Sequence, residues 1–226
     1  MSQLPTTQDD ETQTPSNEQC GATSVGDFID ELSELPDIPV NTPSEIQQLA
    51  DLYDTRDDIP NKSQHAPFFP AAHPEFVPYM KAFIFKAWEH VKATIQINSV
   101  YRTPREQQKL INEYNAWVAA GSDPKKKKAR PGTTSYHLWG MAMDFNPTLA
   151  SGTQLGKAFN SSKELWRGSG LVTIGESVNL YWGGRFTDNY DPIHFDFRNV
   201  APSPAQLKNL TTAQNRSAIP NRVDIA

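Results

Sequence analysis

The stretch SYHLWGMAMDF, residues 135–145, predicts the strand on which the rest of the fold is built. Its second half alternates large apolar residues with small or acidic ones, and successive side chains of a β-strand point to opposite faces. A strand over residues 139–147 would bury one apolar face, formed by Met141, Met143 and Phe145. The other face would carry Gly140, Ala142 and Asp144, with the two small residues leaving room for an ion and a substrate.

A second stretch, PIHFDF at residues 192–197, repeats this alternation. His194 and Asp196 would share one face of that strand, and the apolar residues between them would point the other way. Together with His137 and Asp144, His194 provides the ligand types that hold Zn²⁺: imidazole nitrogens and a carboxylate oxygen at about 2.0–2.2 Å. Three protein ligands leave the fourth position of a catalytic zinc open.

Asp191 precedes His194 by three residues, and a turn in DPIH would bring its carboxylate beside that open position. A metal lowers the pKa of water from about 15.7 to about 7, and a carboxylate base then completes the nucleophile. A His and an Asp seven residues apart occur often by chance, and surface polarity or a strand-end cap explains a single pair equally well. The joint pattern of His137, Asp144, Asp191 and His194 favours a metal site.

Charge divides the chain into an acidic arm and a basic body. Residues 1–65 contain fourteen acidic and two basic residues, whereas the rest of the chain contains twelve acidic and nineteen basic ones. The arm has one aromatic residue, Phe28, before Tyr53, and such a segment buries too little apolar surface to offset its ordering entropy. We therefore expect a largely extended arm at 1–65, a catalytic domain at 66–202 and a C-terminal tail at 203–226.

Two short amphipathic helices are predicted inside the arm, at residues 24–35 and 42–53. The second begins with Thr42 as N-cap and Pro43 at the first helical position, and Glu45 completes a capping box. Such helices either dock on another protein or lie on the body of their own chain. The sequence leaves both alternatives open.

The body begins with helices and continues with strands, an order typical of an α+β fold with a small antiparallel sheet. Apolar periodicity predicts helices over residues 74–93 and 103–120, with a β-rich strand at 94–100 between them. Residues 162–175 predict a short helix followed by a turn. YWGGRF at 181–186 and PIHFDF predict the last two strands.

Several classes of protein are disfavoured by composition. Cys20 is the only cysteine, so a disulfide within one chain and a zinc site built on cysteines are excluded. The N-terminus has neither the basic nor the apolar region of a secretory signal, and no apolar run reaches the roughly 18 residues of a membrane span. We expect synthesis in the cytoplasm. Lys125–Lys128 can contact nucleic acid or an anionic wall polymer, but a solvated loop explains them as well.

Four motifs in order resemble the zinc peptidases of the D-Ala-D-Ala carboxypeptidase and L-alanyl-D-glutamate endopeptidase family. They are Ser99-Val100-Tyr101-Arg102-Thr103, Ser135-x-His137-x-x-Gly140-x-Ala142-x-Asp144, Trp182-Gly183-Gly184 and Asp191-x-x-His194-Phe195. The resemblance covers about residues 74–198. The Trp-Gly-Gly motif looks more like the endopeptidase branch, which includes phage endolysins.

The resemblance implies His137, Asp144 and His194 as the zinc ligands and Asp191 as the general base and acid. It also implies that Arg102 binds the substrate carbonyl or carboxylate and stabilises the oxyanion. A surface salt bridge is the alternative role for Arg102.

The sequence leaves alternative roles open for several other residues. Ser135 and Trp182 are candidate substrate-binding residues, although Ser135 fits better as a group that orients His137 or its loop. The aromatic residues Trp139, Trp182 and Phe186 line a substrate groove or belong to the core. Asp196 is placed to hydrogen-bond a ligand histidine from behind. The remaining histidines, which have no partner at metal spacing, are expected to lie on the surface or to be satisfied in the core: His65, His73 and His90.

The resemblance thus implies a zinc-dependent peptidase that cleaves peptidoglycan stem peptides at the bacterial cell wall, with the L-Ala–D-Glu bond favoured. The acidic arm and the missing signal segment fit a phage lysis protein or an enzyme carried in the virion. In the second case, residues 24–53 would dock on phage structural proteins. The alternative is a non-catalytic structural protein of a phage particle that retains this fold, but every chemical position of the site is filled.

Overall fold

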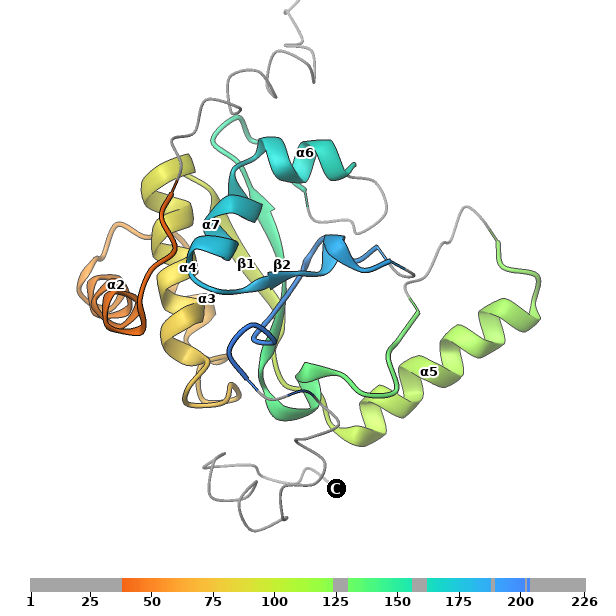
Figure 1. Ribbon diagram of the computed structural model, residues 1–226. Helices are drawn as coiled ribbons and strands as arrows, with labels where there is room; N and C mark the ends of the chain where they lie inside the picture. Colours follow the sequence, from red (N-terminus) through yellow and green to blue (C-terminus); the bar gives the residue numbers. More distant parts are fainter. Residues whose placement is uncertain (1–37, 124–129, 156–161, 188–189, 202, 204–226) are drawn as a thin grey trace, which may run out of the picture.

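The computed structural model describes residues 38–123, 130–155, 162–187, 190–201 and 203. The predicted helix at 24–35 and the four consecutive lysines lie outside the described residues. A small central sheet is packed against helices, and the long helix α5 (Pro104–Ala119) projects to one side of the molecule (Figure 1). None of the described helices has both the length and the hydropathy to cross a bilayer.

The sheet has four antiparallel strands in the order β1-β2-β4-β3, which confirms the predicted α+β class. The strands are β1 (Thr94–Ser99), β2 (Ala142–Thr148), β3 (Tyr181–Trp182) and β4 (His194–Asp196). All four lie within or next to the stretches where alternation predicts them.

One face of the sheet packs on helix α4 (Val77–Val91), whose buried face the periodicity predicts. The ring of Phe83 lies 5.0 Å from that of Phe145 on β2 and 5.3 Å from that of Phe195 on β4, measured between centroids. Residues paired directly across an antiparallel ladder share a face, so Asp144 and His194, which are paired, lie together on the opposite face. The alternation therefore separates core from site.

Strand β2 begins three residues later than predicted because Tyr136–Trp139 form the 3₁₀ turn η2. This turn ends at Gly140, which has a φ of +65°. A Cβ at that position would lie 2.7 Å from the backbone oxygen of Ala71 and 2.9 Å from the backbone nitrogen of His73. The prediction that Gly140 leaves room for a substrate is therefore wrong. Glycine is needed here for its left-handed backbone and for the close approach of the 71–73 segment.

The other described helices are α2 (Pro43–Thr55), α3 (Lys62–His65), α5 (Pro104–Ala119), α6 (Lys163–Gly168), α7 (Leu171–Ser177) and the 3₁₀ turn η3 (Gly183–Arg185). Helix α7 corrects the turn predicted after α6. Its glycine, Gly175, and its β-branched residues Val172, Thr173 and Ile174 give a low helix propensity. Burial overrides that propensity, since Leu171 and Ile174 are fully buried in the core.

Helix α2 confirms the helix predicted at 42–53, including its capping box between Thr42 and Glu45. It packs against α4 and buries Ile46, Ala50 and Tyr53. Of the two alternatives for this helix, the structure shows the one in which it lies on the body.

A chain of buried hydrogen bonds ties α2 to the sheet. The hydroxyl of Tyr53 lies 3.0 Å from Nδ1 of His65, and Nε2 of His65 lies 2.8 Å from the backbone oxygen of Ile95 on β1. Because a carbonyl oxygen only accepts, Nε2 carries the proton and Nδ1 accepts from the tyrosine. His65 is thus a neutral structural histidine, as the sequence predicts.

We expect His65 to make the stability of the fold depend on pH. Burial lowers the pKa of His65, so below the ordinary histidine value of about 6.5 the unfolded chain binds a proton that the folded chain does not. The stabilisation is present above that value and is lost as pH falls, by up to about 1.4 kcal/mol per pH unit. Chemical unfolding of wild type and His65→Gln at pH 8 and pH 5 should show a smaller pH effect in the variant.

His90→Gln is the comparison variant, because His90 lies exposed near the end of α4. Partial burial and the charge of Lys86 also lower the pKa of His90, so we expect a change of the same sign but smaller than in His65→Gln. An equal change of pH dependence in both variants would contradict the role assigned to His65.

Candidate active site

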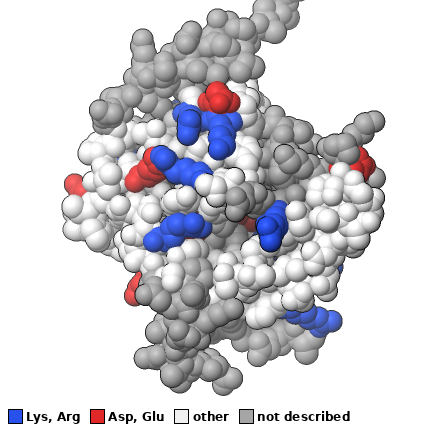
Figure 2. Space-filling view, turned by 45° about the vertical axis from the view of Figure 1, so that its right-hand side comes forward, with Lys and Arg blue, Asp and Glu red and all other residues white. Residues whose placement is uncertain are grey.

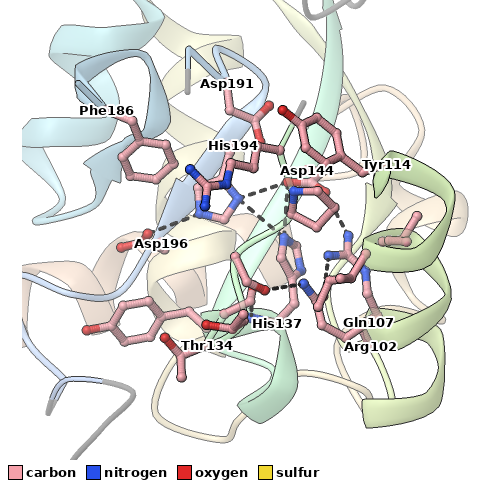
Figure 3. Close-up of a pocket in the computed structure, with 18 of the residues that line it drawn as sticks. Arg102, Gln107, Tyr114, Thr134, His137, Asp144, Phe186, Asp191, His194 and Asp196 are labelled. Atoms are coloured by element: carbon pink, nitrogen blue, oxygen red, sulfur yellow. Dashed lines mark hydrogen bonds and ion pairs between the residues drawn. The ribbon is translucent and has the colours of Figure 1, made fainter. Parts of the chain in front are cut away.

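Three side chains from η2, β2 and β4 converge on one point (Figure 3). Oδ1 of Asp144 lies 3.1 Å from Nε2 of His137 and 3.0 Å from Nδ1 of His194, and these two nitrogens are 3.3 Å apart. Ligand atoms around a tetrahedral zinc with bonds of about 2.0–2.1 Å are separated by about 3.3 Å. The spacing and chemistry of the three atoms therefore fit a zinc ion.

Hydrogen bonds behind the two histidines fix which nitrogen faces the cluster. Nδ1 of His137 lies 2.7 Å from the backbone oxygen of Val100, so it carries the proton and leaves the Nε2 lone pair toward Asp144. Nε2 of His194 lies 3.0 Å from Oδ2 of Asp196, which leaves its Nδ1 toward the cluster. Metal-binding histidines are typically oriented in this way. The predicted place of Asp196 behind a histidine is confirmed.

Arg102 follows a register shift at the end of β1, and its backbone N–H donates to the oxygen of His137 at 3.0 Å. Its guanidinium donates from Nη2 to Oδ2 of Asp144 at 3.3 Å and from Nη1 to Oε1 of Gln107 at 3.0 Å. Gln107, the one buried residue of α5, in turn donates to the backbone oxygen of Gly132 at 2.6 Å. Gln107 was not predicted from the sequence. Its position, four residues into the helix that follows Arg102-Thr103, could have indicated a contact with Arg102.

Asp191 lies in the predicted turn, which closes with a bond from the backbone N–H of His194 to the oxygen of Asp191 at 3.2 Å. The N–H of Asp191 donates to the oxygen of Gly183 at 3.3 Å. Under the turn, Nε1 of Trp182 donates to the oxygen of Pro192 at 2.9 Å. The turn is therefore fixed to the Trp-Gly-Gly segment.

A cavity of about 1440 Å³ surrounds the cluster. Arg102, Ser135 and Asp191 line it together with the three residues of the cluster, and Ser135 also accepts the N–H of His137 at 3.3 Å. Tyr114, which comes from α5, also lines this cavity (Figure 3). The structure does not bring Trp182 into this cavity, because its side chain is fully buried in the core.

Burial and mutual contacts set the pKa values of the cluster. Burial alone would raise the pKa of Asp144, but His137 and His194 hold it well below its usual range. Burial alone would lower the pKa of His194, but its hydrogen bonds to Asp144 and Asp196 raise that pKa to about 10. Burial raises the pKa of Asp191, and a raised carboxyl pKa suits a group that takes up and returns a proton.

The described Lys and Arg residues are spread over the face shown in Figure 2 and do not form one continuous patch. Nucleic acid binding through an extended basic surface therefore gains no support from that face.

Part of the chain matches a known protein family. Residues 128–197 match the family model described as D-alanyl-D-alanine carboxypeptidase. The resemblance to this family is confirmed over that segment. The matched segment contains His137, Asp144, Asp191 and His194, and it begins after Arg102. The match supports a peptidase. No curated protein sequence matches the chain.

Among solved structures, the chain is similar to the L-Ala D-Glu endopeptidase ChiX of Serratia marcescens. The sequence identity is 18% and the TM-score is 0.40. The alignment covers 63% of this chain and 96% of that chain.

Gly183→Ala should disturb the cluster, because a Cβ there would lie 2.5 Å from the backbone oxygen of Asp191 and 2.9 Å from Cβ of His194. We expect zinc binding, measured by competition with a chelator, to weaken about tenfold or more.

Gly152→Ala is the control, since a Cβ at Gly152 meets no atom within 4 Å. Gly152 has a φ of +80°, so its substitution should cost stability, about 1 kcal/mol, without changing zinc affinity. Unchanged zinc affinity in Gly183→Ala would show that the close packing of the turn does not position the ligands.

Proposed function

We propose that this chain is a zinc-dependent peptidase that cleaves peptidoglycan stem peptides, with His137, Asp144 and His194 as the metal ligands. The observation that carries the proposal is the set of three ligand atoms 3.0–3.3 Å apart, with both histidines oriented from behind. The family match over residues 128–197 supports the peptidase class.

When bound, zinc would supply Lewis-acid chemistry, polarising a carbonyl and lowering the pKa of water. In the proposal, Asp191 takes the proton from the attacking water at its carboxylate and returns it to the leaving amine. Its burial and its raised pKa suit this exchange. Backbone hydrogen bonds of Asp191 to His194 and Gly183 limit the movement of Asp191.

Arg102 is proposed to donate to the substrate carbonyl oxygen as negative charge develops there. Its hydrogen bonds to Asp144 and Gln107 hold the guanidinium at the rim of the cluster. Ser135, Tyr114 and Phe186 line the same cavity and are available to contact the peptide on either side of the cleaved bond.

For the bond, we propose L-Ala–D-Glu, because Trp182-Gly183-Gly184 resembles the endopeptidase branch. In this structure the motif is hydrogen-bonded to the Asp191 turn, through Trp182 and Gly183. The side chain of Trp182 does not line the cavity. The influence of the motif on specificity would therefore act through the placement of Asp191.

For the setting, we propose a phage lysis enzyme, carried in the virion and docked through the arm. The apolar face of α2 is already covered by α4, so docking would depend on the predicted helix at 24–35, which lies outside the described residues. Purified particles from a lysate, probed with an antibody against this chain, should contain it. Particles that lack the chain would leave only the free lysis enzyme.

Asp191→Asn tests the catalytic proposal, because it keeps the size of the side chain and removes the base. We expect the rate of peptidoglycan hydrolysis to fall about 10²–10⁴-fold while bound zinc stays at the wild-type level. Mass spectrometry of released fragments and identification of new amino termini would name the bond. Treatment with a chelator should abolish wild-type cleavage, and added Zn²⁺ should restore it.

Asp57→Asn is the matched control, since the Asp57 side chain is fully exposed and far from the cavity in sequence. Full activity in Asp191→Asn would assign the base to another group. Zinc binding without cleavage by wild type would favour the non-catalytic alternative.

A further inference from the structure

Behind His194 lies a buried ion pair that the proposed reaction does not use directly. Asp196 is fully buried, and its Oδ2 accepts the N–H of His194 Nε2 at 3.0 Å. Arg198 donates to the same carboxylate from Nη2 to Oδ2 at 2.5 Å, from Nε to Oδ1 at 2.8 Å and from its backbone N–H to Oδ1 at 3.1 Å. A carboxylate offers about four lone-pair sites, so these four donors saturate it.

Aromatic rings surround the guanidinium of Arg198. The distances from its Cζ to the ring centroids are 4.2 Å for Tyr181, 4.8 Å for Phe186 and 5.6 Å for Tyr136. The ring of Phe186 also lies 5.6 Å from that of His194. A planar guanidinium combines stacking with a forked donor set, which an ammonium group does not. The site therefore suits arginine specifically.

This arrangement decides how the His194 ring is held. The ring bonds on one side to Asp144 and on the other to Asp196, and only the second bond lies outside the ligand cluster. Asp196 itself cannot rotate freely, because Arg198 engages both of its oxygens. The orientation of the ring thus depends on Arg198 through Asp196.

We propose that Arg198 is a positioning residue for metal binding, which acts through Asp196 to keep Nδ1 of His194 facing Asp144 and His137. This inference rests on the proposed zinc function, because the direction of Nδ1 matters only if that atom binds a metal. Without the Arg198 side chain, Asp196 would be a buried carboxylate that has lost two of its four donors, Nε and Nη2, and keeps the backbone N–H of residue 198 and Nε2 of His194. It would then orient the His194 ring poorly.

The test compares Arg198→Ala and Arg198→Lys with the wild type. Loss of an outer partner of a metal ligand typically weakens metal binding about 10–100-fold, so we expect that loss in Arg198→Ala. Arg198→Lys keeps the charge but not the fork, and should fall between the two. Zn²⁺ affinity is measured by chelator competition, and the absorption spectrum of the Co²⁺ form reports a change in the ligand set.

Arg185→Ala is the control, because Arg185 pairs with Glu176 at 2.6 Å and its side chain is 49% exposed. Its zinc affinity should match the wild type. If Arg198→Ala does not fold, Asp196→Asn serves as the second variant and should weaken zinc binding in the same range.

The role of Arg198 and the proposed zinc function are overturned by different results. A wild type that binds zinc, with unchanged affinity and Co²⁺ spectrum in Arg198→Ala, would overturn this inference alone. Equal weakening in Arg185→Ala and Arg198→Ala would also overturn it, since the effect would not be specific to the Asp196 contact. A wild type that binds no zinc would overturn the proposed function together with the inference.

Discussion

The structure depends above all on the register between β2 and β4. Pairing of Asp144 with His194 puts two of the three converging side chains on one face, and pairing of Met143 with Phe195 puts both apolar side chains on the other. Because side chains alternate with a period of two, a slip of one residue would turn the site into the core and the core toward solvent. Core packing on Phe83 of α4 therefore fixes the site geometry as well as the fold.

The pairing alone would leave charged groups buried without compensation, and the surrounding contacts remove that cost. Asp144 is engaged by two histidines and Arg102, and Asp196 by His194 and Arg198. Buried ion pairs contribute little net stability, but removal of one partner is strongly destabilising. Such a network specifies position more than it adds free energy, and a site that must hold three atoms about 3 Å apart needs position.

Much of this site could be predicted because its residues lie on short motifs and on elements with a simple period. Asp144 and His194 follow from alternation, and the turn at Asp191 follows from DPIH. Gly140 and Trp182 could not be assigned in this way, because their roles come from contacts with distant or buried backbone, at Ala71 and Pro192. Helix α7 was missed because local propensity opposed it and only tertiary burial favours it.

Composition does not reveal that residues before 65 belong to the packed body. Asn41 is held at three points: its N–H donates to the oxygen of Ser177 at 2.7 Å, its oxygen accepts from Asn179 at 3.1 Å and its Oδ1 accepts from Lys86 at 2.6 Å. These bonds fix the chain one residue before the cap of α2. The charge balance changes at residue 65, but acidic residues on the outer face of α2 do not prevent its apolar face from being buried. The boundary at 65 thus remains a prediction about composition, whereas the body that carries the cavity already includes α2.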